Sequence, residues 1–73
     1  MTTAADWFTK EAEFRQLCGD AVSLAASERG QEFAHEMMLG ANKFGLQASI
    51  TDAQLRWLCK IAEWDVPKFR GVT

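Results

Sequence analysis

Residues 49–64 read SITDAQLRWLCKIAEW, and this segment predicts one amphipathic helix with a defined start. Thr51 and Gln54 form a capping box: the threonine hydroxyl accepts a hydrogen bond from the backbone N–H three residues on, and the glutamine side chain reaches back to the backbone N–H of the threonine. Pro67 prevents a simple continuation, because proline lacks the N–H that a helix interior requires. We therefore expect a helix over about residues 52–64.

This helix has more apolar surface than one packing face can use. At about 100° per residue, one compact stripe suited to a protein core comprises Leu55, Leu58, Cys59 and Ala62. On the same wheel, Trp57 and Trp64 fall on the opposite side, with Ile61 on the shoulder between the two faces. Arg56 and Lys60 belong to the remaining polar sector. The second apolar face must be covered by another part of the chain or by a partner.

Both interpretations of the second face are physically reasonable. Small domains often use their terminal segments to cover apolar surface, and here Trp7 with Phe8, or Val66 with Phe69, could serve. Alternatively, the face binds a partner, since tryptophan and arginine are enriched at binding hot spots. The partner-binding residues would then be Trp57, Trp64, Ile61, Arg56 and Lys60.

The preceding sequence predicts two further helices. Apolar residues recur at spacings of three and four over residues 9–26 and again over residues 28–44. Ser27 is a suitable N-cap for the second of these helices, and Gly45 is well placed to end it. Met37 and Met38 in the second helix suit either core filling or a binding surface. The sequence thus predicts a single all-α domain over residues 1–73, a small three-helix bundle with a short C-terminal tail.

Charge is distributed unevenly along the chain. The net charge is −2, but residues 1–36 carry seven acidic and three basic side chains, whereas residues 37–73 carry three acidic and five basic ones. A broad basic surface for nucleic acid is therefore not expected. The acidic first half offers a second candidate binding face, comprising Glu11, Glu13, Asp20, Glu28, Glu32 and Glu36.

The sequence contains no pattern that indicates catalysis, a metal or a cofactor. His35 is the only histidine, and Cys18 and Cys59 are too far apart in the chain to form a zinc-binding pair of cysteines. No glycine-rich phosphate loop follows a strand, and no nucleophile has an evident base. We therefore expect a protein that is not an enzyme.

The cysteines and the N-terminal sequence indicate the compartment. Cys18 and Cys59 fall on apolar helical stripes, which is typical of unpaired cysteines in a reducing compartment, although a disulfide is geometrically possible if the two stripes face each other. The opening MTTAADW has neither the basic nor the apolar region of a signal peptide, and no apolar run is long enough to span a membrane. A cytoplasmic protein is expected.

Residues 31–64 resemble a helical segment of small phage and prophage accessory proteins. The resemblance lies in a helix, a short loop, and then the run ITDAQLRWL followed by Ile61 and Ala62. In those proteins a serine or threonine cap leads into a Lys-Gln or similar pair, and here Ala53 replaces the lysine before Gln54. The resemblance implies a phage-encoded accessory protein and assigns no activity.

The leading functional expectation is a non-catalytic protein-binding module. In a phage setting it would be an inhibitor, with the acidic face covering a nucleic-acid-binding surface of a host defence complex such as a CRISPR effector. One alternative is a three-helix, helix-turn-helix-like nucleic-acid-binding domain, with Arg56 and Lys60 on its recognition helix and Lys68 and Arg70 in the tail. Another is a structural subunit of a homo-oligomer, such as a homodimer.

Overall fold

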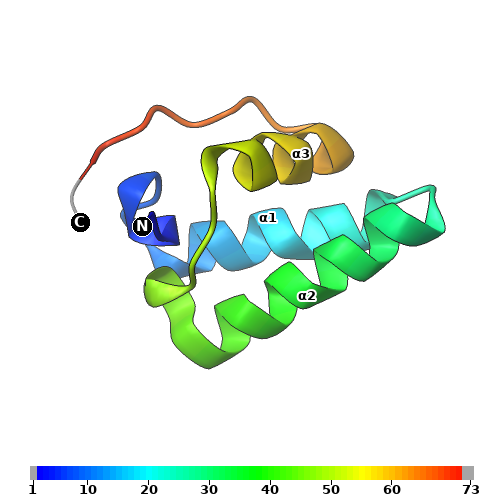
Figure 1. Cartoon of the computed structure of the whole chain (residues 1–73), viewed down its shortest axis with the longest axis horizontal. Coiled ribbons are helices and arrows are strands. Elements are labelled where there is room, and N and C mark those ends of the chain that lie inside the picture. Colours follow the sequence, from blue (N-terminus) through cyan, green and yellow to red (C-terminus); the bar gives the residue numbers. More distant parts are fainter. Residues whose placement is uncertain (1, 72–73) are drawn as a thin grey trace.

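The computed structural model describes residues 2–71, and within them it contains three α-helices and two short 3-10 helices. The α-helices are α1 (Glu11–Leu24), α2 (Glu28–Phe44) and α3 (Asp52–Ala62), and the 3-10 helices are η1 (Ala4–Asp6) and η2 (Gly45–Gln47) (Figure 1). The predicted all-α, three-helix fold with a short C-terminal tail is confirmed. The observed α2 has the predicted bounds, whereas α1 is two residues shorter at each end and α3 ends two residues early.

Local hydrogen bonds explain where the helices begin. At the start of α3 the backbone N–H of Gln54 donates to Thr51 Oγ1 at 3.1 Å, and the backbone N–H of Thr51 donates to Gln54 Oε1 at 2.9 Å. At the start of α2 the Ser27 hydroxyl accepts from the backbone N–H of Gly30 at 3.0 Å. Both predicted caps are therefore confirmed, and each satisfies a backbone N–H that has no partner within the helix.

The ends of α2 and α3 both use a residue with positive φ. Gly45 stops α2 with φ of 59° and ψ of −132°, a conformation that glycine adopts without a side-chain clash. Glu63 stops α3 in the left-handed region, with φ of 59° and ψ of 39°. The chain therefore turns away from the helix axis before it reaches Trp64.

The bundle is built on α1. This helix packs against both α2 and α3, which contact each other far less, and it lies between them in Figure 1. The predicted α3 stripe of Leu55, Leu58, Cys59 and Ala62 is buried. It meets Phe14, Leu17, Cys18 and Ala21 of α1 in one hydrophobic core. Cys18 and Cys59 are both buried as free thiols.

The N-terminal segment completes this core at one end. Trp7 and Phe8 are almost fully buried, and the Phe8 ring lies 5.6 Å from that of Phe14. Residues 2–4 pair with residues 48–50: the backbone N–H of Ala4 donates to the Ala48 carbonyl at 3.0 Å, and an isolated antiparallel bridge joins Thr3 and Ser49. Trp7 and Phe8 are thus core residues themselves.

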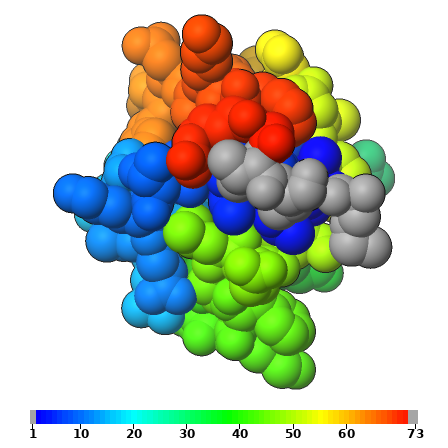
Figure 2. All heavy atoms as spheres, turned by 90° about the vertical axis from the view of Figure 1, so that its left-hand side faces the viewer, coloured from blue at the N-terminus to red at the C-terminus, as the bar shows by residue number. Residues whose placement is uncertain are grey.

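The C-terminal tail covers the N-terminal segment. The Phe69 ring packs edge-on against Trp7, with 5.3 Å between the ring centroids. The Arg70 guanidinium donates to the carbonyl oxygens of Ala5 and Phe8 at 3.3 and 3.2 Å. Figure 2 shows the orange and red tail lying across the blue N-terminal residues. The tail therefore covers Trp7 and leaves α2 uncovered.

Candidate partner-binding groove

The structure separates the two tryptophans that the helical wheel had placed together. Trp64 follows the end of α3, so the wheel no longer applies to it, and its indole N–H donates to Asp20 Oδ2 on α1 at 2.8 Å. Its backbone N–H donates to the Cys59 carbonyl at 2.9 Å. Trp64 is partly buried against the core, so its contacts are those of a structural residue.

Trp57 lies on the other side of α3 and faces α2. Its ring stacks on that of Phe33, with 4.3 Å between the centroids and an interplanar angle of 14°. Trp57 remains 38% exposed despite this contact. The stacked pair therefore bridges α2 and α3 and presents an aromatic surface to solvent.

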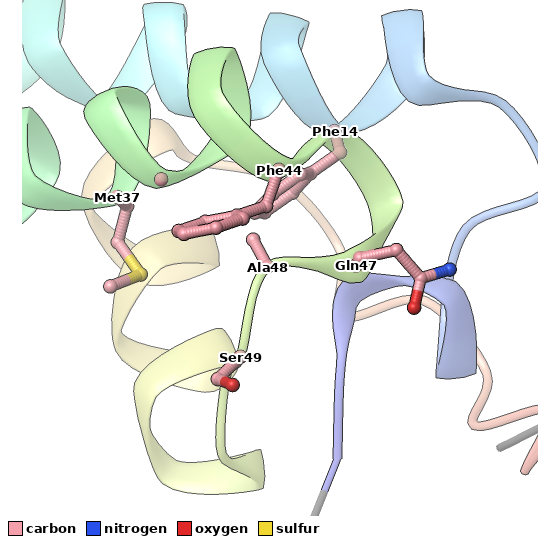
Figure 3. A pocket seen from close by; sticks show the side chains of 7 residues that line it. Phe14, Met37, Phe44, Gln47, Ala48 and Ser49 are labelled. Atoms are coloured by element: carbon pink, nitrogen blue, oxygen red, sulfur yellow. The ribbon is translucent and has the colours of Figure 1, made fainter.

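A cavity of about 290 Å³ lies toward the C-terminal end of α2. Its lining comprises Phe14, Met37, Gly40, Phe44, Gln47, Ala48 and Ser49, so α1, α2 and the segment after α2 all contribute (Figure 3). Ligand pockets commonly measure about 300–1,000 Å³, so this cavity is at the lower end of that range.

Two residues make this cavity open and apolar. Gly40 contributes no side chain, and a Cβ atom built there would meet only Ala48 Cβ, at 3.8 Å. Phe44 is 55% exposed at the rim, where Lys43 Nζ lies 5.4 Å from its ring centroid. We use the name α2–α3 groove for the Phe33–Trp57 stack taken together with the cavity residues Met37, Gly40, Phe44 and Ala48.

The other residues predicted on α3 occupy different positions around the helix. Ile61 is partly buried, and its Cδ1 would lie 3.6 Å from a Cβ atom at Gly30, so it fills the space between α2 and α3. Arg56 is exposed and its Nε donates to Asp52 Oδ2 at 2.8 Å. Lys60 is exposed. Of the five predicted residues, only Trp57 belongs to the groove.

The six predicted acidic residues do not form one face. Glu11 pairs with Arg15 at 3.6 Å, and Glu13 accepts from the Thr9 hydroxyl at 3.4 Å. Asp20 is partly buried between Gln16 and Trp64, accepting from both side chains at 2.8 Å. The remaining acidic residues are Glu28, Glu32 and Glu36, which are exposed along α2.

These three glutamates are spaced by four residues along α2. Each step of four residues turns about 40° around a helix, so Glu36 lies beside Gly40, whereas Glu28 lies about 120° away from Gly40 around α2. Over residues 2–71, no salt bridge involves any of the three glutamates. Arg29 and Lys43 are also exposed and are each seven residues from Glu36, so this side of α2 carries charges of both signs.

The sequence alone did not identify the α2 half of the groove. Phe33, Met37 and Phe44 fit a core stripe equally well, and Gly40 only interrupts that stripe. No spacing in the sequence distinguishes a cavity wall from a core stripe here. The distinction depends on how α1 places α2 and α3.

The buried thiols are not candidate nucleophiles. Burial raises the pKa of Cys18 from 9.0 to about 12, against a smaller lowering by a backbone hydrogen bond, and burial also raises the pKa of Cys59. Both thiols are therefore protonated near neutral pH, and the thiol is a poor nucleophile compared with the thiolate. Within residues 2–71, no group of three or more His, Cys, Asp and Glu side chains is arranged to hold a metal ion.

Comparison with protein-family models, with curated proteins and with solved structures found no match. Among the described helices, none is both long and apolar enough to cross a membrane.

Proposed function

We propose that this protein is a non-catalytic protein-binding module that docks a partner in the α2–α3 groove. The observation that carries the proposal is the Phe33–Trp57 stack beside an open apolar cavity whose rim includes the exposed Phe44 ring. Protein interfaces commonly use such a cluster, in which an aromatic surface adjoins a pocket for a partner side chain.

More specifically, we propose that the protein is a cytoplasmic, phage-encoded accessory protein that inhibits a host complex. The resemblance of residues 31–64 to phage accessory proteins supports the setting, and the excess of acidic over basic side chains in residues 1–36 supports a basic target. Nucleic-acid-binding surfaces are basic, so a chain with an acidic first half suits a protein that covers one, for example on a CRISPR effector.

Direct nucleic-acid binding is less well supported than protein binding. The net charge of the chain is −2, and Arg56 is paired with Asp52. A homodimer that buries the same groove is a distinct outcome that the experiment below can detect.

The test is affinity capture from cells that carry the gene, comparing wild type with two variants at one position. Gly40→Leu would place a branched side chain in the cavity, whereas Gly40→Ala adds a single carbon in ordinary contact with Ala48. We expect the wild type and Gly40→Ala to retain the same specific partner and Gly40→Leu to lose it, with all three folded by circular dichroism. Equal capture by Gly40→Leu would show that the groove is not the docking site.

A further inference from the structure

The outward face of α2 is a surface distinct from the α2–α3 groove. The buried residues of α2 are Gly30, Ala34 and Ala41, and at about 100° per residue Leu39 projects on the side opposite to them. Among the large hydrophobic side chains of residues 2–71, Leu39 is the most exposed, at 67%. It lies about 100° around α2 from Gly40 and does not line the cavity. The outward face therefore presents an exposed leucine to solvent.

Opposite charges flank Leu39 on this face. Glu36 lies three residues before Leu39 and Lys43 four residues after it, so both project within about 60° of the leucine, about one helical turn to either side. Both charged side chains are exposed, and within residues 2–71 no salt bridge involves either of them. The outward face thus carries, in chain order, a negative charge, an apolar side chain and a positive charge.

This order is self-complementary when two copies of α2 pack antiparallel. A two-fold axis beside Leu39 would place the two Leu39 side chains against each other. The same axis would bring Glu36 of each copy to within one residue, or about 1.5 Å along the helix, of Lys43 of the other copy. A parallel arrangement would instead place each charge beside its own copy, which is unfavourable. The charges therefore select the antiparallel arrangement.

The remaining charged residues of α2 do not oppose this arrangement. Glu28, Arg29 and Glu32 lie at least seven residues before Leu39, so they would fall beyond the end of the other copy's α2, which stops five residues after Leu39. His35 is on the other side of Leu39 from Glu36 around the helix, away from the charge pairs.

We propose that the protein self-associates through the outward face of α2, as an antiparallel dimer centred on Leu39 and held by two Glu36–Lys43 pairs. Leu39 and the cavity are on different sides of α2, so the dimer leaves both α2–α3 grooves open. This inference goes beyond the proposed function and does not depend on it. One pair of helices buries less than the roughly 1,600 Å² of a standard interface, so the dimer should be weak.

Sedimentation equilibrium of the full chain over about 10 μM to 1 mM tests the dimer, since weak complexes form in this range. We expect a mass that rises with concentration from 8.2 kDa towards twice that value. Leu39→Gln should weaken self-association at least tenfold, because each dimer loses two apolar side chains from its interface. The matched control is Leu24→Gln, at an exposed leucine of α1, which should leave self-association within about twofold of wild type.

Charge reversals at low salt test the antiparallel pairing. Glu36→Lys and Lys43→Glu, each alone, would replace both attractive pairs by repulsive ones and should weaken self-association at least fivefold. The double variant Glu36→Lys/Lys43→Glu exchanges the two charges at unchanged net charge and should restore self-association to within about twofold of wild type. Both positions are exposed, and circular dichroism confirms that each variant is folded.

Three results would overturn the inference. The first is a wild-type chain that stays monomeric at every concentration. The second is a dimer that Leu39→Gln leaves intact, which would place the contact on another face. The third is a double charge variant as weak as the single variants, which would contradict the antiparallel pairing. None of these results bears on docking in the α2–α3 groove, which the Gly40 variants test separately.

Discussion

The indole N–H of Trp64 and the carboxylate of Asp20 join residues 44 positions apart in the chain, and this hydrogen bond fixes the segment after α3 to α1. Trp57, seven residues earlier, instead stacks on Phe33 and remains more than one-third exposed. The difference arises from Glu63, whose left-handed conformation ends α3 between the two tryptophans. Two residues of one type in one short segment therefore have different roles, one structural and one in the candidate groove.

Replacing Trp64 by phenylalanine should lower the free energy of unfolding by at least about 1 kcal/mol, because the partly buried hydrogen bond to Asp20 is lost. Urea denaturation followed by circular dichroism measures this change. Asp20→Ala should cost a similar amount, and the double variant should cost less than the sum of the two single variants, since both remove the same bond. Strictly additive effects would show that the two side chains do not interact.

Stability should fall as the pH rises above about 9. Burial holds the pKa of Cys18 at about 12, against 9.0 for an exposed thiol, and also raises that of Cys59. In this interval the unfolded chain loses its thiol protons while the folded chain keeps them, so alkali favours unfolding by up to about 1.4 kcal/mol per pH unit for each thiol. Urea denaturation at several pH values would show a shallower decline for Cys18→Ala than for wild type. Equal declines would contradict the burial of this thiol.

Helix α2 packs against the core with one face and lines the cavity with the adjacent face. Its buried residues Gly30, Ala34 and Ala41 are small, which lets the helix approach the rest of the bundle closely. On the adjacent face, Met37, Gly40 and Phe44 line the cavity. A glycine inside a helix costs stability relative to alanine, so Gly40 leaves the cavity open at an energetic cost.

Gly40→Ala should therefore raise the free energy of unfolding by about 1 kcal/mol, because alanine is the better helix former and the added carbon meets nothing closer than Ala48. The measurement is the urea midpoint at unchanged slope. A lower midpoint would mean that the wall of the cavity at Gly40 is tighter than the 3.8 Å approach to Ala48 indicates.

Elements whose boundaries depend on nearby residues could be predicted from the sequence. The caps at Ser27 and Thr51 and the stop at Gly45 each involve contacts within four residues, and all three were predicted. The end of α3 could not be predicted, because Glu63 adopts the left-handed conformation without being a glycine. The Phe33–Trp57 stack could not be predicted from the sequence either, because it depends on how α1 places α2 and α3.

At the scale of the whole molecule, the two ends of the described chain stabilise each other and leave the groove open. Residues 2–4 pair with residues 48–50, and the tail then packs over Trp7 through Phe69 and Arg70 (Figure 2). A chain of 73 residues has a small core, so such terminal contacts contribute a sizeable part of its stability.

A chain that ends at Pro67 should be less stable by about 1–3 kcal/mol, because it loses the Trp7–Phe69 contact and the hydrogen bonds from Arg70. Thermal unfolding followed by circular dichroism measures the loss. Partner binding at a temperature where both chains are folded should be unchanged, since the tail does not line the groove. Loss of binding by the folded, shortened chain would place the tail in the interface.

The most direct test of the groove is site-specific photo-crosslinking with p-benzoylphenylalanine, introduced in place of either Phe44 or Phe69 in the presence of the captured partner. The two phenylalanines are equally exposed, at 55%, but only Phe44 borders the groove, whereas Phe69 packs on Trp7. We predict a crosslink to the partner from position 44 and none from position 69. A crosslink from position 69 alone would contradict docking in the α2–α3 groove.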